Sequence, residues 1–139
     1  MKIKFKKLTE DAFMPERAHA TDAGYDLRAT GVKQEGGCWV YSTGIALEIP
    51  KGYVGLIFPR SSVYKTNLLL SNCVGVIDSG YRGEILFKYK ALTQHPMVYN
   101  IGDKIGQIVF IKYQVMEFIE ATALKDSDRG EGGFGSTGK

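Results

Sequence analysis

Four loops of this chain carry more charged residues and glycines than turns require, and a glycine-rich run follows them. They are ATDAGYDLRA (20–29), PRSSV (59–63), NCVGVIDSGYRGEI (72–85), GDKIGQIVF (102–110) and RGEGGFGSTGK (129–139). Arginine, hydroxyl groups and a glycine-rich backbone suit the binding of an anion, and a carboxylate can activate water. Covalent catalysis is disfavoured, because neither His19 nor His95 lies in a polar, glycine-rich setting.

Single positions in these loops point to particular roles. Asp78 follows the apolar run VGVI, so we expect it at the mouth of the core, where a partly desolvated carboxylate is suited to act as a general base. Arg60 precedes two hydroxyl side chains and could bind a phosphate bidentately. Gln107 stands inside an apolar strand, where a buried amide needs a partner or points into a site.

Each of these loops also has a purely structural explanation. Asp22 and Asp26 could form an Asx-type turn before a strand. Ser61 or Ser62 could cap a short helix, and Asp78 could form a hairpin turn. Because side chains alternate between the two faces of a strand, Gln107 could also simply face outward.

The last segment resembles a phosphate-binding P-loop only in part. Gly133, Gly138 and Lys139 have the spacing of that motif, but neither a Ser or Thr nor a helix follows Lys139. We therefore exclude an NTPase P-loop, and a disordered terminus is the simple alternative.

Length and composition set the class of protein. The 139 residues suffice for one domain, and a net charge of +3 is too weak to imply nucleic-acid binding. No apolar run approaches the length of a membrane span, and MKIKFKKLTED lacks the apolar region of a signal peptide. Cys38 and Cys73 form no CxxC motif, so we expect reduced thiols, no structural zinc site and a cytoplasmic location.

The elements that must position these loops are almost all strands. Alternating or β-branched segments predict strands at 1–7, 39–49, 53–58, 67–77, 84–92, 105–113 and 115–121. Residues 39–58 are expected to form a hairpin, 67–77 a buried run, and 62–70 is the best helical candidate. This spacing predicts an antiparallel all-β sandwich or jelly roll.

Together, in this order, the five segments resemble the five motifs of the homotrimeric all-β dUTP diphosphatases (dUTPases). The matching stretches are ATDAGYDL, PRSS, NCVGVIDSGYRGEI, GDKIGQI and RGEGGFGSTG, which span nearly the whole chain. The resemblance implies a jelly-roll-like domain over 1–125, a flexible glycine-rich lid over 126–139, and a homotrimer whose sites are shared between subunits. It implies hydrolysis of dUTP to dUMP and pyrophosphate with Mg²⁺, which keeps dUTP low and supplies dUMP for dTMP synthesis.

The resemblance also implies residue roles. Asp78 would activate the attacking water, Gln107 would hold that water, and Asp26 would hold the hydration shell of Mg²⁺. The implied substrate-binding residues are Arg60, Ser61 and Ser62 for phosphate, Asn72, Gly75, Val76 and Ile77 for uracil, Tyr81 under the deoxyribose, and Arg129, Phe134, Gly135, Ser136 and Thr137 of the lid. Phe134 would stack on the uracil, and Arg129, Ser136 and Thr137 would bind the γ-phosphate.

Some positions depart from the family pattern. Gly80, Lys104 and Gly106 stand where the family commonly has Asp, Arg and Ala. Ser62 replaces a frequent Gly, and Asp22 places a charge that we expect to weaken triphosphate binding.

Two other functions are weighed. The related dCTP deaminases need a Glu where this chain has Lys88, and a lysine cannot shuttle protons in that way. A dUTPase fold used as a regulatory binding protein is the second alternative, although we see no extra insert between motifs three and four.

Overall fold

Strands dominate residues 2–133, the part of the chain that the computed structural model describes. The strands are β1 (Lys4–Lys7), β2 (Tyr25–Arg28), β3 (Gly31–Glu35), β4 (Cys38–Ser42), β5 (Ile45–Glu48), β6 (Tyr53–Phe58), β7 (Leu68–Leu70), β8 (Gly75–Ile77), β9 (Leu86–Ala91) and β10 (Lys104–Lys112), and a 3₁₀ helix η1 spans Ser61–Lys65. Within this range no helix has the length and apolar character needed to cross a membrane. The predicted all-β class is confirmed.

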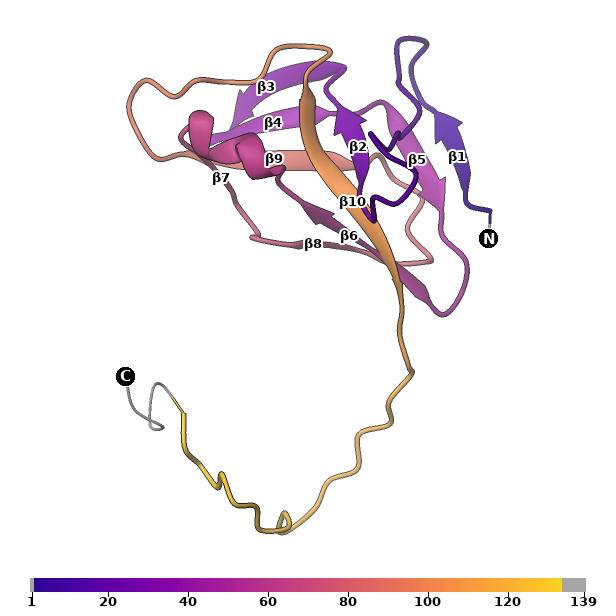
Figure 1. The fold of residues 1–139 in the computed structure, drawn as a ribbon, viewed down its shortest axis with the longest axis vertical. Helices are drawn as coiled ribbons and strands as arrows, with labels where there is room; N and C mark the ends of the chain where they lie inside the picture. Colours follow the sequence, from indigo (N-terminus) through magenta and orange to yellow (C-terminus); the bar gives the residue numbers. More distant parts are fainter. Residues whose placement is uncertain (1, 134–139) are drawn as a thin grey trace.

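The strands form two four-stranded antiparallel sheets and a two-stranded ribbon (Figure 1). One sheet has the order β2-β10-β6-β8, the other β3-β4-β9-β7, and β1 pairs with β5. Along β9, Phe87 and Tyr89 are fully buried while Lys88 and Lys90 are exposed, as the period of two requires. The buried side chains of both sheets form one apolar core.

Tyrosines connect the two sheets inside this core. The Tyr89 hydroxyl donates a hydrogen bond of 2.6 Å to the carbonyl oxygen of Ile105 in β10. The backbone N–H of Tyr99 donates to the Tyr41 hydroxyl over 3.1 Å, and the rings of Tyr41, Tyr89 and Tyr99 make edge and tilted contacts. Burial raises the pKa of Tyr89, so this hydroxyl remains a protonated donor to β10.

Strand β10 contains an irregularity that decides which side chains face outward. Its pairing with β2 shifts register between Lys104 and Gly106, as at a β-bulge. Ile105 and Ile108 are both fully buried, although a regular strand would place them on opposite faces. Lys104 and Gln107 consequently share the outer face of the sheet.

Glycine is required at position 106 by close packing. A Cβ atom there would overlap the ring of Phe87 and lie 2.9 Å from the carbonyl oxygen of Phe58. The absence of a side chain therefore lets β10 pack directly on Phe87.

Several expectations about the elements are wrong. Residues 39–58 form no hairpin, because β4, β5 and β6 belong to three different sheets. The run 67–77 is broken by an exposed turn between β7 and β8, and the helical candidate 62–70 yields η1 followed by a strand. The segment after β8 is not a hairpin turn either, because it crosses from one sheet to the other before β9.

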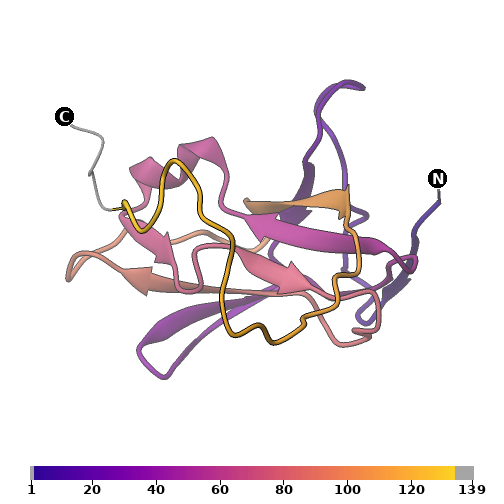
Figure 2. The ribbon, with the colours of Figure 1, turned by 90° about the horizontal axis from the view of Figure 1, so that it is seen from below.

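The segment after β10 makes no strand up to Gly133, so the strand expected at 115–121 is absent. Residues 113–133 run away from the body in Figure 1 and cross beneath it in the view from below (Figure 2). The side chains of Val115, Phe118 and Ile119 are 86%, 98% and 82% exposed. Without a cross-strand partner, the apolar pattern of this segment cannot order it as a strand. The domain boundary at 125/126 stays a prediction.

We expect Gly106→Ala to lower the free energy of unfolding by about 1–3 kcal/mol, because the new methyl group overpacks Phe87. Gly80→Ala is the control, since no described heavy atom lies within 4 Å of a Cβ there, and its effect should stay within about 0.5 kcal/mol. Urea unfolding at one protein concentration measures both. Adding Phe87→Leu should cost less in the Gly106→Ala background than alone, and strictly additive effects would contradict the packing argument.

Candidate active site

A polar pocket of about 400 Å³ opens where the loop after β6 meets β2 and β10. Gln107 pairs directly with Asp26 on one side and Phe58 on the other. Directly opposite residues of antiparallel strands project to the same face, so these three side chains line the pocket from the outer face of the sheet. The residues around it are Ala18, Asp22, Ala23, Gly24, Asp26, Phe58, Arg60, Ser61, Gln107 and Val109.

Asp26 is the buried charge of this polar pocket. Only 11% of its side chain is exposed. One carboxylate oxygen accepts from Arg60 Nε at 2.9 Å, and the other lies 2.9 Å from Lys104 Nζ. The Arg60 guanidinium is thus held by one edge, which leaves its terminal nitrogens to meet an anion in the pocket.

A second carboxylate stands behind Lys104. Glu16 Oε1 lies 3.2 Å from Lys104 Nζ and accepts a 2.7 Å hydrogen bond from Arg28. Hydrogen bonds to Asp26, and then to Glu16, raise the pKa of the Lys104 ammonium. Hydrogen bonds from Arg28, and then from Lys104, lower the pKa of the Glu16 carboxyl.

Gln107 is fixed by the backbone around it. Its Nε2 donates to the carbonyl oxygen of Pro59 over 3.2 Å. A Cβ atom at Gly24 would overlap Gln107 Oε1, so glycine is required there for this orientation. Gln107 therefore faces outward from β10, as the structural alternative had it, and at the same time lines the polar pocket.

The loop after β6 places Ser61 in the polar pocket, but not as a helix cap. The N-cap of η1 is Arg60, and in the described part of the chain no side chain caps this helix. Ser62 is half-buried and does not line the pocket among the described residues. The structural alternative of a serine cap is therefore wrong, and Ser61 lines the polar pocket, where a ligand can reach it.

Asp22 closes a turn with residues before it, and not the Asx-type turn into the strand that the structural alternative named. Its carboxylate accepts from the backbone N–H of His19 at 2.8 Å, and its own N–H donates to the His19 carbonyl oxygen at 3.1 Å. Asp26, in contrast, lies in strand β2 itself. The effect of the Asp22 charge on anion binding stays a prediction.

A second pocket lies beside β8, and we call it the β8 pocket. It is lined by Ile57, Asn72, Gly75, Val76, Ile77, Asp78, Tyr81, Glu84 and Leu86. A Cβ atom at Gly75 would overlap Ile57, so the β8 backbone lies directly against β6. Asp78 is exposed at the end of β8, not partly desolvated as expected. The volume of about 190 Å³ is below the roughly 300–1,000 Å³ of ordinary small-molecule sites.

The two pockets belong to opposite faces of one sheet. Ile57 lines the β8 pocket and the next residue, Phe58, lines the polar pocket. Neighbouring residues of a strand project to opposite faces. Arg60, Ser61, Gln107 and Asp26 therefore meet on one face, and the β8 pocket, where Gly75 and Ile77 lie on the side of Ile57, belongs to the other. The Val76 side chain, opposite Leu56, projects to the first face.

The remaining predicted site residues lie on the C-terminal segment. Arg129 is exposed, its Nε donates to the carbonyl oxygen of Gly132 at 2.9 Å, and it lines neither pocket as described for residues 2–133. Phe134, Gly135, Ser136 and Thr137 lie outside the described residues, so their predicted roles are not tested.

The donor set of the polar pocket limits how a metal ion could be held. No group of three or more His, Cys, Asp or Glu side chains suited to a metal occurs among residues 2–133. Asp26 offers a carboxylate in the pocket, and its oxygens already accept from Arg60 and Lys104. A single carboxylate suits Mg²⁺, which keeps most of its water ligands and binds through one or two carboxylates together with substrate phosphates, while the two cations on Asp26 reduce the negative charge that it offers to the ion.

Sequence reasoning missed three contributors to these sites. Glu16 and Arg28 act on Asp26 through Lys104, and no local pattern shows this, because Glu16 lies outside the motif that holds Asp26. Glu84 accepts from the backbone N–H groups of Thr43 and Gly44 at 3.1 and 2.7 Å, which fixes the wall of the β8 pocket. Glu84 belongs to the loop 72–85, but its partners lie about forty residues earlier in the sequence, so no local pattern shows these contacts.

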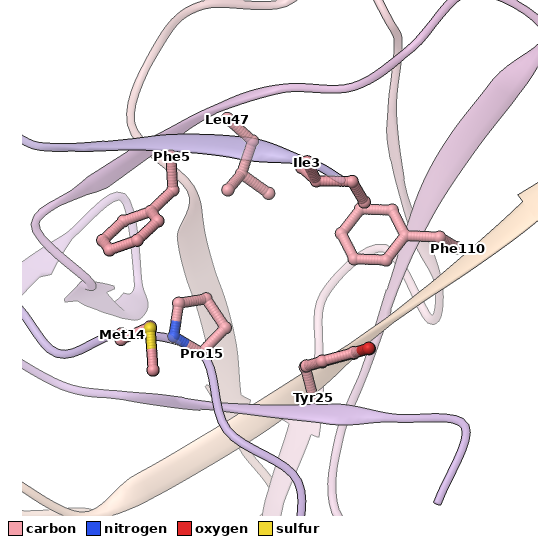
Figure 3. A pocket seen from close by; sticks show the side chains of 7 residues that line it. All are labelled: Ile3, Phe5, Met14, Pro15, Tyr25, Leu47 and Phe110. Atoms are coloured by element: carbon pink, nitrogen blue, oxygen red, sulfur yellow. The ribbon is translucent and has the colours of Figure 1, made fainter. Parts of the chain in front are cut away.

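A third pocket is apolar and has a different character (Figure 3). Its seven side chains surround an open centre, and the Tyr25 hydroxyl supplies the one side-chain oxygen among them. They are Ile3, Phe5, Met14, Pro15, Tyr25, Leu47 and Phe110. This lining suits apolar side chains and not a charged ligand.

Comparison with known proteins extends over almost the whole chain. The family model described as dUTPase matches residues 10–138. The deoxyuridine 5'-triphosphate nucleotidohydrolase of Corynebacterium glutamicum is 41% identical, over 99% of this chain and 95% of the relative. That of Solibacter usitatus is 37% identical, over 100% and 97%.

Solved structures agree. A mutant dUTPase of Staphylococcus bacteriophage 80alpha with dUpNHpp has a TM-score of 0.87 and 31% identity, over 99% of both chains. The dUTPase of phage phi11 of S. aureus has a TM-score of 0.79 and 29% identity, over 91% of this chain and 100% of the other. A match that runs from residue 10 to residue 138, with relatives aligned over nearly their full length, shows that this chain belongs to the dUTPase family.

Proposed function

We propose that this protein hydrolyses dUTP to dUMP and pyrophosphate. The observation that carries the proposal is the convergence of Arg60, Gln107 and Asp26 in the polar pocket, with Arg60 held by Asp26 at 2.9 Å. These groups suit a triphosphate and a positioned water. Curated relatives that align along the chain are named deoxyuridine 5'-triphosphate nucleotidohydrolases, in accord with this chemistry.

Arg60 and Ser61 bind phosphate in this proposal. The guanidinium is oriented by Asp26 and presents its terminal nitrogens, which can bind two oxyanions in parallel. The Ser61 hydroxyl follows directly and adds a donor. Ser62, half-buried in η1, supports this turn without reaching the pocket.

Asp78 takes the proton of the attacking water, and Gln107 positions that water. Asp78 is solvent-exposed, so a water molecule can reach its carboxylate. The Gln107 amide keeps one donor on Pro59, so its Oε1 and second N–H are free for the water and an α-phosphate oxygen. Mg²⁺ bound with the substrate would neutralise charge on the phosphates, and Asp26 would hold its water ligands.

The β8 pocket is proposed to select the base and the sugar. Asn72 and the backbone of Gly75, Val76 and Ile77 would read uracil, and the absence of a side chain at Gly75 leaves room beside Ile57. The Tyr81 hydroxyl donates to the Glu84 carbonyl oxygen at 3.1 Å, which holds the ring where a 2′-hydroxyl would clash. The segment 126–139 would close over the nucleotide as a lid, with Arg129 on the γ-phosphate.

We further propose that the active unit is a homotrimer. The polar pocket and the β8 pocket lie on opposite faces of one sheet, so one nucleotide cannot contact both within a single chain. A second copy that brings its β8 pocket to the polar pocket would complete the site.

The C-terminal segment supplies a means of assembly. Val115, Phe118 and Ile119 expose apolar surface that water disfavours. We infer that this segment packs on another copy, and the apolar pocket of Figure 3 has the matching chemistry. The free thiols of Cys38 and Cys73 accord with the cytoplasmic location that we propose.

The first prediction is substrate selectivity. With Mg²⁺, the protein should convert dUTP to dUMP and pyrophosphate and leave dCTP, dTTP and UTP unchanged, as ion-exchange chromatography of the products would show. Consumption of dCTP would instead favour the deaminase alternative. That outcome is not expected, because Lys88 is exposed and the Glu84 carboxylate is bound to backbone N–H groups.

A second prediction concerns the general base. Asp78→Asn should lower kcat by about a hundredfold or more while binding of dUpNHpp is retained, because an amide cannot take the proton. Asp11→Asn, an exposed carboxylate away from both pockets, is the control. A kcat close to that of the control would assign the base role to another group. A protein partner bound equally by Asp78→Asn would support the regulatory alternative.

The third prediction tests the shared site by complementation. Arg60→Ala and Asp78→Asn should each be inactive, but their co-expression should restore about a quarter of wild-type activity. In random trimers about three-quarters are mixed, and each mixed trimer has one site of three with both halves intact. If each chain held a complete site, no activity would return.

A further inference from the structure

Glu16 lies directly beside Asp26, although ten positions separate them in the sequence. The backbone N–H of Asp26 donates to the Glu16 carbonyl oxygen at 2.6 Å, and the Glu16 N–H donates to the Asp26 carbonyl oxygen at 3.3 Å. This isolated antiparallel bridge places two carboxylates next to each other. Such a pair is unfavourable without cations between them.

Lys104 is the cation that the two carboxylates share. Its Nζ lies 2.9 Å from Asp26 and 3.2 Å from Glu16. Lys104 is also the direct cross-strand partner of Arg28, which donates to Glu16 at 2.7 Å. Glu16 therefore lies between the cations Lys104 and Arg28 and offsets their mutual repulsion. It also competes with Asp26 as an acceptor for Lys104.

The contact between the Lys104 ammonium and Asp26 affects how strongly Asp26 can attract a divalent cation. Asp26 carries one negative charge, which Arg60 already offsets, so a Lys104 bound to Asp26 alone would give this group a net positive charge. A carboxylate neutralised in this way attracts hydrated Mg²⁺ poorly. If Glu16 accepts from Lys104 instead, the ammonium is offset there, and the Asp26 carboxylate remains more available to the cation.

We propose that Glu16 is a positioning residue for Mg²⁺ binding, which draws Lys104 away from Asp26 when the ion and the substrate phosphates enter the polar pocket. Asp26 then exchanges the ammonium for water molecules of the metal's hydration shell. This inference rests on the proposed function of the polar pocket. It gives Lys104 a role that depends on an acid outside the motifs.

The electrostatic signs make the proposal testable. Replacing Glu16 by Gln removes a negative charge near the cation and leaves Lys104 on Asp26, and both changes weaken Mg²⁺ binding. The same loss of negative charge favours, or leaves unchanged, binding of a metal-free triphosphate. A general loss of structure would weaken both.

The experiment titrates dUpNHpp into the full-length protein by calorimetry, in EDTA and at increasing Mg²⁺. For Glu16→Gln we expect the Mg²⁺ concentration that gives half of the affinity gain to rise about tenfold, as for partners of metal-binding groups. Affinity in EDTA should not fall. Glu48→Gln, which breaks the exposed 3.0 Å pair with Lys4, is the matched control and should behave as wild type.

A double variant tests the path through Lys104. In a Lys104→Met background, Glu16→Gln should change the Mg²⁺ requirement much less than in the wild type. Persistence of the full effect would mean that Glu16 acts on the ion directly, and the proposal would be wrong. An unchanged Mg²⁺ requirement in Glu16→Gln alone would also overturn it.

The same titration separates this inference from the proposed function. If the wild-type protein failed to bind dUpNHpp, or gained nothing from Mg²⁺, the function of the pocket would be at fault. If the wild type showed the gain and Glu16→Gln showed it at the same Mg²⁺ concentration, only the role of Glu16 would fail. Melting temperatures of all variants establish that they are folded.

Discussion

The alternation of side chains along β6 is the constraint on which the arrangement of the site depends. Ile57 must face the core and the β8 pocket because its neighbour Phe58 faces the polar pocket. No change of rotamer can bring the two pockets together, since the backbone of a sheet lies between them. The division of the site into halves thus follows from the period of a strand, and assembly of several copies is the way to unite them.

The buried carboxylate of Asp26 fixes the side chains around the polar pocket. Asp26 is nearly inaccessible, and such a carboxylate is tolerated because Arg60 and Lys104 neutralise it with good geometry. The same contacts fix the direction of the Arg60 guanidinium before any ligand arrives. Binding energy then need not be spent on ordering this long side chain.

Much of the fold could be predicted from local patterns. The strand at 84–92 was evident because its apolar residues alternate, and that at 105–113 because it is rich in β-branched and apolar residues; β9 and β10 confirm them. The prediction of a hairpin over 39–58 was wrong, because strands that follow one another in the sequence need not pair, and the local pattern does not show which sheet each strand joins. The strand at 115–121 failed because an alternating pattern forms a strand only where a partner edge is present.

The candidate site was predictable where its participants lie within the five matching motifs. Arg60, Ser61 and Gln107 lie together as the ordered motifs implied, although their catalytic and binding roles stay predictions. Glu16 and Arg28 were not predictable, because their contacts with Lys104 and with each other depend on strand register. The exposure of Asp78 was also missed, since its place after an apolar run did not show that β8 lies at the edge of its sheet.

The bulge in β10 has a consequence for chain length. Because Ile105 and Gly106 both belong to the inner side, Lys104 and Gln107 can share the outer face of the sheet across an interval of three residues. A regular ladder over the same four residues would instead place Lys104 and Gln107 on opposite faces, with one of the two polar side chains turned toward the core. The extra residue therefore serves the inner side of the strand: deleting it would keep Lys104 and Gln107 on the outer face but would remove either the buried Ile105 or the glycine that lets β10 pack on Phe87.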